Sequence, residues 1–130
     1  MMNLEEFARE IFLSQPFSQY LGAELESVGD GSADISLNIR ELHTQQHGFV
    51  HGGVISYLAD NALTFAGGLA LGGDALTSEY KINFLRPARG DKLLAHAWTL
   101  SRGKRQAVCQ CKVVCNEMLV AVAQGTIVAA

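Results

Sequence analysis

The sequence is short of positive charge and of cysteine, and both shortages narrow the possible classes of function. Its 130 residues include 10 Lys and Arg against 13 Asp and Glu, which gives a formal net charge of −3 at pH 7. Without a basic excess we expect no nucleic-acid or membrane partner, although a local basic patch could bind a phosphorylated small molecule. The three cysteines are an odd number in a short chain. They favour a reducing, cytoplasmic location over a disulfide framework.

Patterns that would target or anchor the chain are missing too. The first residues, MMNLEEFAREIFLSQPF, carry acids early and no basic stretch followed by an apolar one, so we expect no signal peptide. Residues 54–71 are long and apolar enough to resemble a membrane span. A core helix is expected instead, because the segment contains polar residues that are costly in a bilayer: Ser56, Asp60, Asn61 and Thr64.

The chain also has no internal repeat, linker or low-complexity tract, and 48% of its residues are apolar. This fits one compact domain over residues 1–130. Hydrophobic periodicity predicts a helix at 3–13, a further turn at 16–22, a longer helix at 53–70, and strands at 23–28, 32–40, 76–86, 92–101, 105–116 and 118–129.

The order of these elements predicts an α+β fold. Helices and strands are segregated, and short turns join neighbouring strands, which excludes a βαβ plan. Residues 53–70 are apolar almost all round, so this helix must be buried. We therefore expect an antiparallel sheet of five to six strands curved around one long helix. The last two strands are apolar on both faces, which indicates association with another chain.

Several motifs lack the partners that their usual chemistry needs. The HGG of residues 51–53 is not accompanied by the G-x-S-x-G elbow of serine hydrolases, and GGLALGG is not a dinucleotide-binding G-x-G-x-x-G. His43, His47 and His51 are spaced four apart, but Gly48, Gly52 and Gly53 break any helix that would align them as metal ligands. The segment CQCKVVC places three residues on one parity of a strand, where we expect core side chains and no metal: Cys109, Cys111 and Cys115.

Asp60 is the residue whose presence most needs a reason, since burying a carboxylate is costly. With Ser56 and Thr64 it forms a narrow polar stripe on the helix at 53–70. A buried, hydrogen-bonded structural aspartate is one interpretation. Catalysis is the other, because Gly52 and Gly53 leave backbone N–H groups bare at the start of the helix. Such donors suit a carbonyl oxygen that gains negative charge during acyl transfer.

Helix geometry separates these two groups. Asp60 lies about 10 Å along the axis from Gly53, at 1.5 Å per residue. A base and an oxyanion donor must both lie near one reacting carbon, which a single helix does not achieve. Two antiparallel helices from two subunits can. We therefore expect a dimer with two equivalent sites, in which residues 43–53 of one chain lie near Asp60 of the other.

Two stretches resemble a known family. They are HGFVHGGVISYLADNALTFA, which contains G-x-V-H-G-G-V followed by L-A-D, and TSEYKINFLRPARGDKLLAHAWTLSRGKRQAVCQCKVVCNEMLVAVAQGT. Both are similar to the hotdog-fold acyl-CoA thioesterases of the phenylacetate-pathway type, and the similarity runs from about residue 17 to the end. The resemblance implies a long helix wrapped by an antiparallel sheet, dimers joined edge to edge, often dimers of dimers, and hydrolysis of an acyl-CoA thioester.

The resemblance also implies roles for individual residues. Asp60 matches the catalytic carboxylate, acting as general base or nucleophile, and Gly52 matches the residue whose N–H polarises the carbonyl. His51 lies beside it, and Thr77 matches a hydroxyl that helps to hold the attacking water. Gln45 stands where many members carry asparagine. No cofactor is implied, since coenzyme A is part of the substrate; candidates for its phosphates are Arg86, Arg89, Arg102, Lys104 and Arg105.

Two other functions remain open at this point. One is a hotdog-fold acyl-CoA hydratase or acyl-carrier-protein dehydratase, which would use a catalytic histidine with a carboxylate in a different motif. The other is a non-catalytic acyl-CoA binding protein or sensor. The presence of Asp60 favours the hydrolase.

Overall fold

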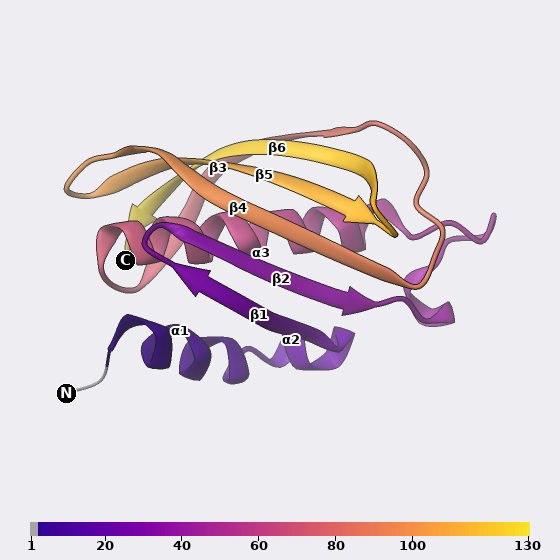
Figure 1. The fold of residues 1–130 in the computed structure, drawn as a ribbon, viewed down its shortest axis with the longest axis horizontal. Coiled ribbons are helices and arrows are strands. Elements are labelled where there is room, and N and C mark those ends of the chain that lie inside the picture. Colours follow the sequence, from indigo (N-terminus) through magenta and orange to yellow (C-terminus); the bar gives the residue numbers. More distant parts are fainter. Residues whose placement is uncertain (1–2) are drawn as a thin grey trace.

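A long helix lies in the hollow of a curved six-stranded sheet (Figure 1). The computed structural model describes residues 3–130. In chain order the elements are α1 (Leu4–Leu13), α2 (Pro16–Leu21), β1 (Ala23–Gly29), β2 (Ser32–Asn38), a 3₁₀ turn (Glu41–His43), α3 (Gly52–Leu71), β3 (Ala75–Phe84), β4 (Lys92–Arg102), β5 (Gln106–Cys115) and β6 (Met118–Ala129). The predicted α+β class, antiparallel sheet and central helix are confirmed.

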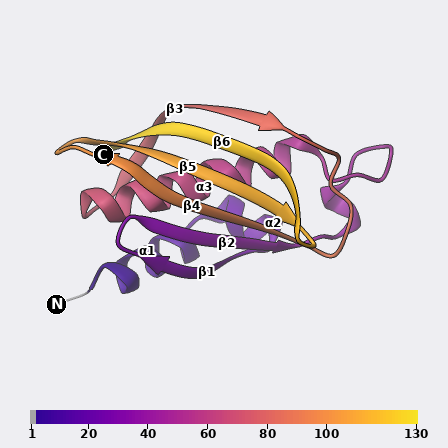
Figure 2. The same cartoon turned by 45° about the horizontal axis from the view of Figure 1, so that its top comes forward.

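The sheet has the order β1-β2-β4-β5-β6-β3, and every neighbouring pair is antiparallel. Tight turns join β1 to β2, β4 to β5 and β5 to β6. The helix α3 separates β2 from β3, so β3 returns to the far edge beside β6 (Figure 2). The two edge strands are therefore β1 and β3, and each presents one side of its backbone that no other strand within residues 3–130 covers.

The helix α3 supplies the centre of the core. Its side toward the sheet is buried, and Gly67 lies so close to β6 that a Cβ there would be 2.5 Å from the Cβ of Ile127. The helix is long and apolar enough to cross a membrane, but 67% of that apolar window is buried inside the protein. It is therefore the buried core helix, as its polar residues predicted.

The ends of two strands differ from the sequence pattern by two residues. The strand expected at 32–40 ends at Asn38, because the N–H of Arg40 instead donates to Nδ1 of His43 at 2.9 Å and begins the 3₁₀ turn. The strand expected at 76–86 ends at Phe84, shortly before Pro87, whose nitrogen cannot donate to a sheet.

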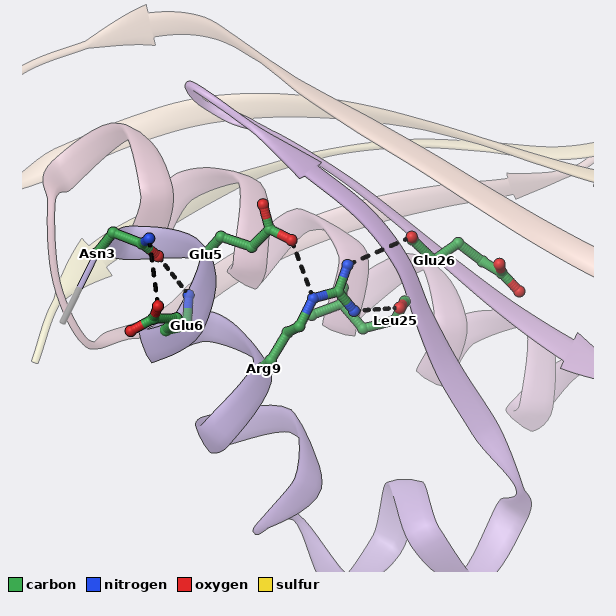
Figure 3. A network of polar contacts seen from close by, with 6 residues as sticks. All are labelled: Asn3, Glu5, Glu6, Arg9, Leu25 and Glu26. Atoms are coloured by element: carbon green, nitrogen blue, oxygen red, sulfur yellow. Dashed lines mark hydrogen bonds and ion pairs between the residues drawn. The ribbon is translucent and has the colours of Figure 1, made fainter.

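The two N-terminal helices cover β1 and one flank of α3 (Figure 1). Asn3 caps α1 by accepting a hydrogen bond from the N–H of Glu6 at 2.8 Å. Arg9 fastens α1 to β1, since its guanidinium donates to the Leu25 carbonyl at 2.9 Å and forms an ion pair with Glu5 at 3.2 Å (Figure 3). The cap thus defines the first turn of α1, and Arg9 holds its middle against β1.

The helix α2 contacts α3 through polar side chains. The Tyr57 hydroxyl donates to Ser18 Oγ at 2.5 Å, and Asn61 Nδ2 donates to Gln15 Oε1 at 3.0 Å. Burial raises the pKa of Tyr57 above its usual value, so this hydroxyl remains a donor at neutral pH. These contacts lie on one side of α3, and the half-buried residues Ser56, Asp60 and Thr64 lie on the side nearer β3.

The three cysteines lie in the core, as predicted. Cys109, Cys111 and Cys115 on β5 are buried free thiols. Their side chains share the inward parity of the strand with Ala107 and Val113, which are buried as well.

Candidate active site

A row of half-buried polar residues on α3, here called the α3 stripe, lies beside β3. It consists of Ser56, Asp60 and Thr64, spaced one helical turn apart. The neighbouring face of α3 is buried against the sheet. The stripe therefore brings hydroxyls and a carboxylate to an open side of a helix whose other residues are mostly apolar.

The carboxylate of Asp60 is held by a residue of β3. Thr77 Oγ1 donates to Asp60 Oδ1 at 2.6 Å, and it also lies 2.6 Å from Thr64 Oγ1. Thr64 Oγ1 can donate to the Asp60 carbonyl at 2.8 Å instead. The hydroxyls of Thr64 and Thr77 have one proton each for these three contacts, so only two of the contacts can be hydrogen bonds at one time. A charged acceptor forms a stronger hydrogen bond than a neutral one. The Thr77 proton is therefore committed to the Asp60 carboxylate when that group is ionised.

An irregularity in β3 accompanies this contact. The pairing of β3 with β6 shifts between Thr77 and Glu79, so that Ser78 is an extra residue in the strand. A bulge of this kind changes the direction of neighbouring side chains. It lies where β3 turns the Thr77 hydroxyl toward α3, and the sequence pattern alone did not reveal it.

A second contact joins the stripe to β3 one turn earlier. Ser56 Oγ and the Tyr80 hydroxyl are 2.5 Å apart. Tyr80 pairs with Gly125 on β6, and a Cβ at position 125 would lie 2.7 Å from the Cβ of Tyr80. The glycine in the AQGT motif thus makes room for the tyrosine. Sequence reasoning did not single out Tyr80, although the glycine opposite it was a signal.

The start of α3 presents one unpaired backbone donor. His51 caps the helix, because its Nδ1 accepts a hydrogen bond from the Gly53 N–H at 2.8 Å and its carbonyl accepts one from Val54 at 2.9 Å. The Gly52 N–H has no acceptor within residues 3–130. The Phe84 ring passes over Gly52, 3.6 Å from where a Cβ would be. The resemblance implied that the Gly52 N–H polarises the substrate carbonyl. The helix cap leaves this N–H without an acceptor within residues 3–130.

A cleft lies in front of this helix end. It has a volume of about 420 Å³, and its lining includes Gln45, Phe49, Gly52, Phe84 and Arg86. Gln45 contributes to the shape of the preceding loop, since its Oε1 accepts a hydrogen bond from the His47 N–H at 2.5 Å. The structure therefore brings Gln45, Gly52 and Arg86 to one cleft.

Asp60 does not line this cleft. Eight residues separate it from Gly52, which amounts to about 12 Å along the helix axis. Asp60 and Thr77 meet in one place, while Gly52, His51 and Gln45 meet in another. Within one protomer the proposed base and the proposed oxyanion donor do not converge.

The basic candidates also form two separate groups. Arg89 lies over the Phe49 ring, 4.7 Å from its centroid, and donates to the His47 carbonyl at 3.1 Å, so it is close to Arg86 and the cleft. Arg102 forms an ion pair with Asp30 at 3.1 Å at the other end of the sheet. The turn that follows β4 carries Lys104 and Arg105 at that same end (Figure 1).

The three histidines that are spaced four residues apart have unlike surroundings. His43 is fully buried, and both ring nitrogens are engaged, one with the Arg40 N–H and the other with the Leu21 carbonyl at 2.8 Å. His51 caps α3, and His47 is exposed in the loop. His43 is therefore a structural residue. Its regular spacing with His47 and His51 did not indicate this role.

Comparison with known proteins gives the family. The thioesterase superfamily matches residues 47–122, a range that begins before α3 and ends in β6. The chain belongs to the thioesterase superfamily. The prediction of a thioester hydrolase is confirmed at this level. A curated relative, the acyl-coenzyme A thioesterase PaaI of Escherichia coli K12, is 31% identical over 82% of this chain and 76% of its own length.

Solved structures give the same answer for the fold of this thioesterase-superfamily member. A thioesterase family protein from Silicibacter pomeroyi superposes with a TM-score of 0.92 at 28% identity, covering 97% of both chains. The E. coli PaaI protein of the phenylacetic acid degradation operon has a TM-score of 0.91 at 27% identity, covering 98% of this chain and 93% of that one. The predicted hotdog fold is confirmed.

Proposed function

We propose that the protein hydrolyses acyl-CoA thioesters at a site shared by two copies of the chain. Asp60 of one copy and the Gly52 N–H of the other act on the same thioester carbonyl. The observation that carries the proposal is the hydrogen bond from Thr77 to Asp60 Oδ1, made on the open side of α3. Asp60 Oδ2 has no partner within residues 3–130, so it is available to a water molecule. A carboxylate fixed in this way can act as a general base.

The proposed reaction conserves atoms as follows. Asp60 takes a proton from water, and the water oxygen bonds to the carbonyl carbon. The carbonyl oxygen becomes negative and accepts a hydrogen bond from the Gly52 N–H of the second copy. The carbon–sulfur bond then breaks, and the sulfur leaves with the bonding electrons and takes the proton from Asp60. The products are a free acid and coenzyme A. Direct attack by the Asp60 carboxylate, with an anhydride intermediate, is the alternative.

A second copy is needed because Gly52 and Asp60 of one chain are about 12 Å apart along the axis of α3. We place the contact between the two copies at the edge strand β3. This strand is an unpaired edge on the same side of the molecule as the α3 stripe. Large apolar side chains on and after it are exposed, with Leu76, Phe84 and Leu85 between 50% and 61% accessible. An edge strand with exposed apolar residues is a site for pairing with another chain. We assign a homodimer to this edge, and a dimer of dimers would use the outer sheet face.

Coenzyme A would bind through its phosphates at the cleft. Arg86 lines the cleft and Arg89 lies next to it. In a dimer whose α3 helices are antiparallel, the β4–β5 turn of the second copy would lie near the cleft of the first. Arg102, Lys104 and Arg105 of that turn would then add positive charge to the cleft. Arginine is suited to bidentate contacts with phosphate.

The other two functions have less support. A hydratase would need a catalytic histidine paired with a carboxylate, whereas His43 is fully engaged in the structure and His51 is the helix cap. His96 pairs with Asp34, but it is an exposed residue of β4 and does not line the cleft. A sensor would not need the carboxylate that Thr77 positions. Membership of the thioesterase superfamily favours hydrolysis over both.

The test is release of free thiol from a panel of acyl-CoA thioesters by the wild-type chain and by Asp60→Asn. The substitution keeps the shape of the side chain and removes its charge. We expect a fall in kcat of roughly 10²- to 10⁴-fold, the usual contribution of a positioned general base, with an unchanged melting temperature. Asp91→Asn, which changes an exposed carboxylate in the turn before β4, is the control and should retain activity. Equal turnover by Asp60→Asn and wild type would refute the assignment.

A further inference from the structure

Tyr80 on β3 makes a second contact between this strand and the α3 stripe, and the proposed reaction does not use it. Its hydroxyl lies 2.5 Å from Ser56 Oγ, and both residues are half-buried. Thr77, which donates to Asp60 Oδ1 at 2.6 Å, lies three residues earlier on the same strand. The strand β3 is therefore fastened to α3 by two hydroxyl contacts that involve successive turns of the helix.

The two contacts lie on either side of the bulge in β3. Side chains on one face of a regular strand are two residues apart, so Thr77 and Tyr80 would point to opposite faces. Both reach α3 because Ser78 is an extra residue, where the pairing with β6 shifts between Thr77 and Glu79. Residues 77–80 thus form a short irregular segment that is fastened to α3 at both ends.

This segment has little support apart from those two contacts. The strand β3 is an edge of the sheet, so within residues 3–130 only β6 pairs with it (Figure 2). A bulge disrupts the ladder of backbone hydrogen bonds locally. Glu79 accepts a hydrogen bond from Thr126 Oγ1 at 2.5 Å, which ties the segment to β6 and not to α3. The distance between Thr77 and Asp60 therefore depends on how firmly the segment is held to the helix.

Tyr80 is itself held from two directions. Gly125 lies opposite it on β6, and a Cβ at position 125 would be 2.7 Å from the Tyr80 Cβ. On the other side, the Ser56 hydroxyl bonds to Tyr80 alone within residues 3–130. Thr64 differs, because its hydroxyl can bond to the helix carbonyl four residues earlier. The Ser56 hydroxyl is thus committed to the contact with Tyr80.

We propose that Tyr80 is a positioning residue for thioester hydrolysis. Through Ser56 it holds residues 77–80 against α3 and so keeps the Thr77 hydroxyl on Asp60. This inference rests on the proposed function, because it takes Asp60 as the base. Tyr80 acts on the chemistry only through Thr77, so its removal affects kcat and has no effect when the Thr77 hydroxyl is absent.

The experiment measures kcat and KM for thiol release by Tyr80→Phe, which keeps the ring and removes the hydroxyl. The substrate is the acyl-CoA thioester that the wild type hydrolyses fastest. We expect kcat to fall about 2- to 10-fold, the factor by which one neutral hydrogen bond shifts an equilibrium, with KM little changed. Ser56→Ala removes the same contact from the helix side and should lower kcat by a similar factor. If Tyr80→Phe does not fold, Ser56→Ala decides.

A double-mutant cycle separates positioning from a general loss of structure. In the Thr77→Val background, Tyr80→Phe should cause no further fall in kcat, because no hydroxyl is left for it to position. Independent effects would multiply instead, and that result would overturn the inference. Tyr20→Phe is the matched control, since it removes the same atom from a tyrosine of α2 that is 73% exposed. Its kcat and KM should equal those of the wild type.

Two further results would overturn the positioning role and leave hydrolysis intact. One is equal kcat for Tyr80→Phe, Ser56→Ala and the wild type. The other is a rise in KM at unchanged kcat, since it would place Tyr80 in contact with the substrate. Full activity of Asp60→Asn, or no thiol release by the wild type from any thioester, would instead overturn the proposed function and the positioning role with it.

Discussion

Thr77 on β3 donates a hydrogen bond of 2.6 Å to the carboxylate of Asp60 on α3. This contact joins the edge strand to the central helix at the open side of the molecule. Any partner chain that pairs with β3 therefore acts directly on the element that orients the carboxylate. Asp60 Oδ2 has no partner within residues 3–130, so under the proposed mechanism it is the oxygen that meets the attacking water.

Removing that hydroxyl should lower turnover more than it lowers binding. Thr77→Val keeps the shape of the side chain and removes the donor to Asp60. We expect kcat to fall between about 10- and 100-fold, since a small misplacement of a catalytic group can cost about 10²-fold, with KM little changed. Thr77→Ser restores the donor and should recover most of the rate. Equal kcat values for Thr77→Val and wild type would show that Asp60 does not need this donor.

The close approach of α3 to β6 predicts a large effect of one methyl group. A Cβ at Gly67 would lie within 2.5–2.8 Å of Ile127 side-chain atoms, inside the core. Gly67→Ala should destabilise the fold by about 1–3 kcal/mol through overpacking, less the roughly 1 kcal/mol by which alanine favours a helix. Urea unfolding measures this difference in the free energy of unfolding. Gly73→Ala is the control, because nothing lies within 4 Å of its added Cβ. Equal stability of both variants would contradict the packing argument.

Much of the fold could be predicted from the sequence because its patterns are local and strong. The alternation of Ser32–Asn38 and the nearly continuous apolar surface of α3 determine which side of each element is buried. The strand order could not be predicted. Placing β3 next to β6 depends on pairing over more than 40 residues, such as Thr77 with Ile127, and no short-range signal specifies it.

The site was predictable in part. Asp60 stood out because a carboxylate in an apolar helix is costly, and Thr77 came from resemblance alone. The bulge at Ser78 and the Ser56–Tyr80 contact were not foreseen, since both arise from the register of β3 against α3 and β6. His43 looked like part of a histidine row, but its role is set by the Leu21 carbonyl, which is distant in sequence.

The buried thiols should resist alkylation in the folded protein. Burial raises the pKa of Cys111 to about 12, and it also raises the pKa values of Cys109 and Cys115. A raised thiol pKa means that the reactive thiolate is scarce, about one part in 10⁴ for Cys111 at pH 8. Iodoacetamide at pH 8 should label all three residues only after unfolding in guanidinium chloride, as counted by mass spectrometry. Rapid labelling of Cys111 in the native protein would contradict its burial.

The shared site predicts which residue lies on the two-fold axis. Ser56 is four residues from Gly52 and four from Asp60, so two antiparallel helices that place Gly52 opposite Asp60 must place position 56 opposite itself. Packed helices have axes about 8–10 Å apart, which brings facing Cα atoms close to the roughly 4.4–6.8 Å that a disulfide requires. Ser56→Cys should therefore form a covalent dimer under mild oxidation, seen by non-reducing electrophoresis. Ser101→Cys, an exposed residue near the end of β4, should not, and the wild type should not because its thiols are buried. A monomer of Ser56→Cys, together with a monomeric and fully active wild type in size-exclusion chromatography, would refute the shared site.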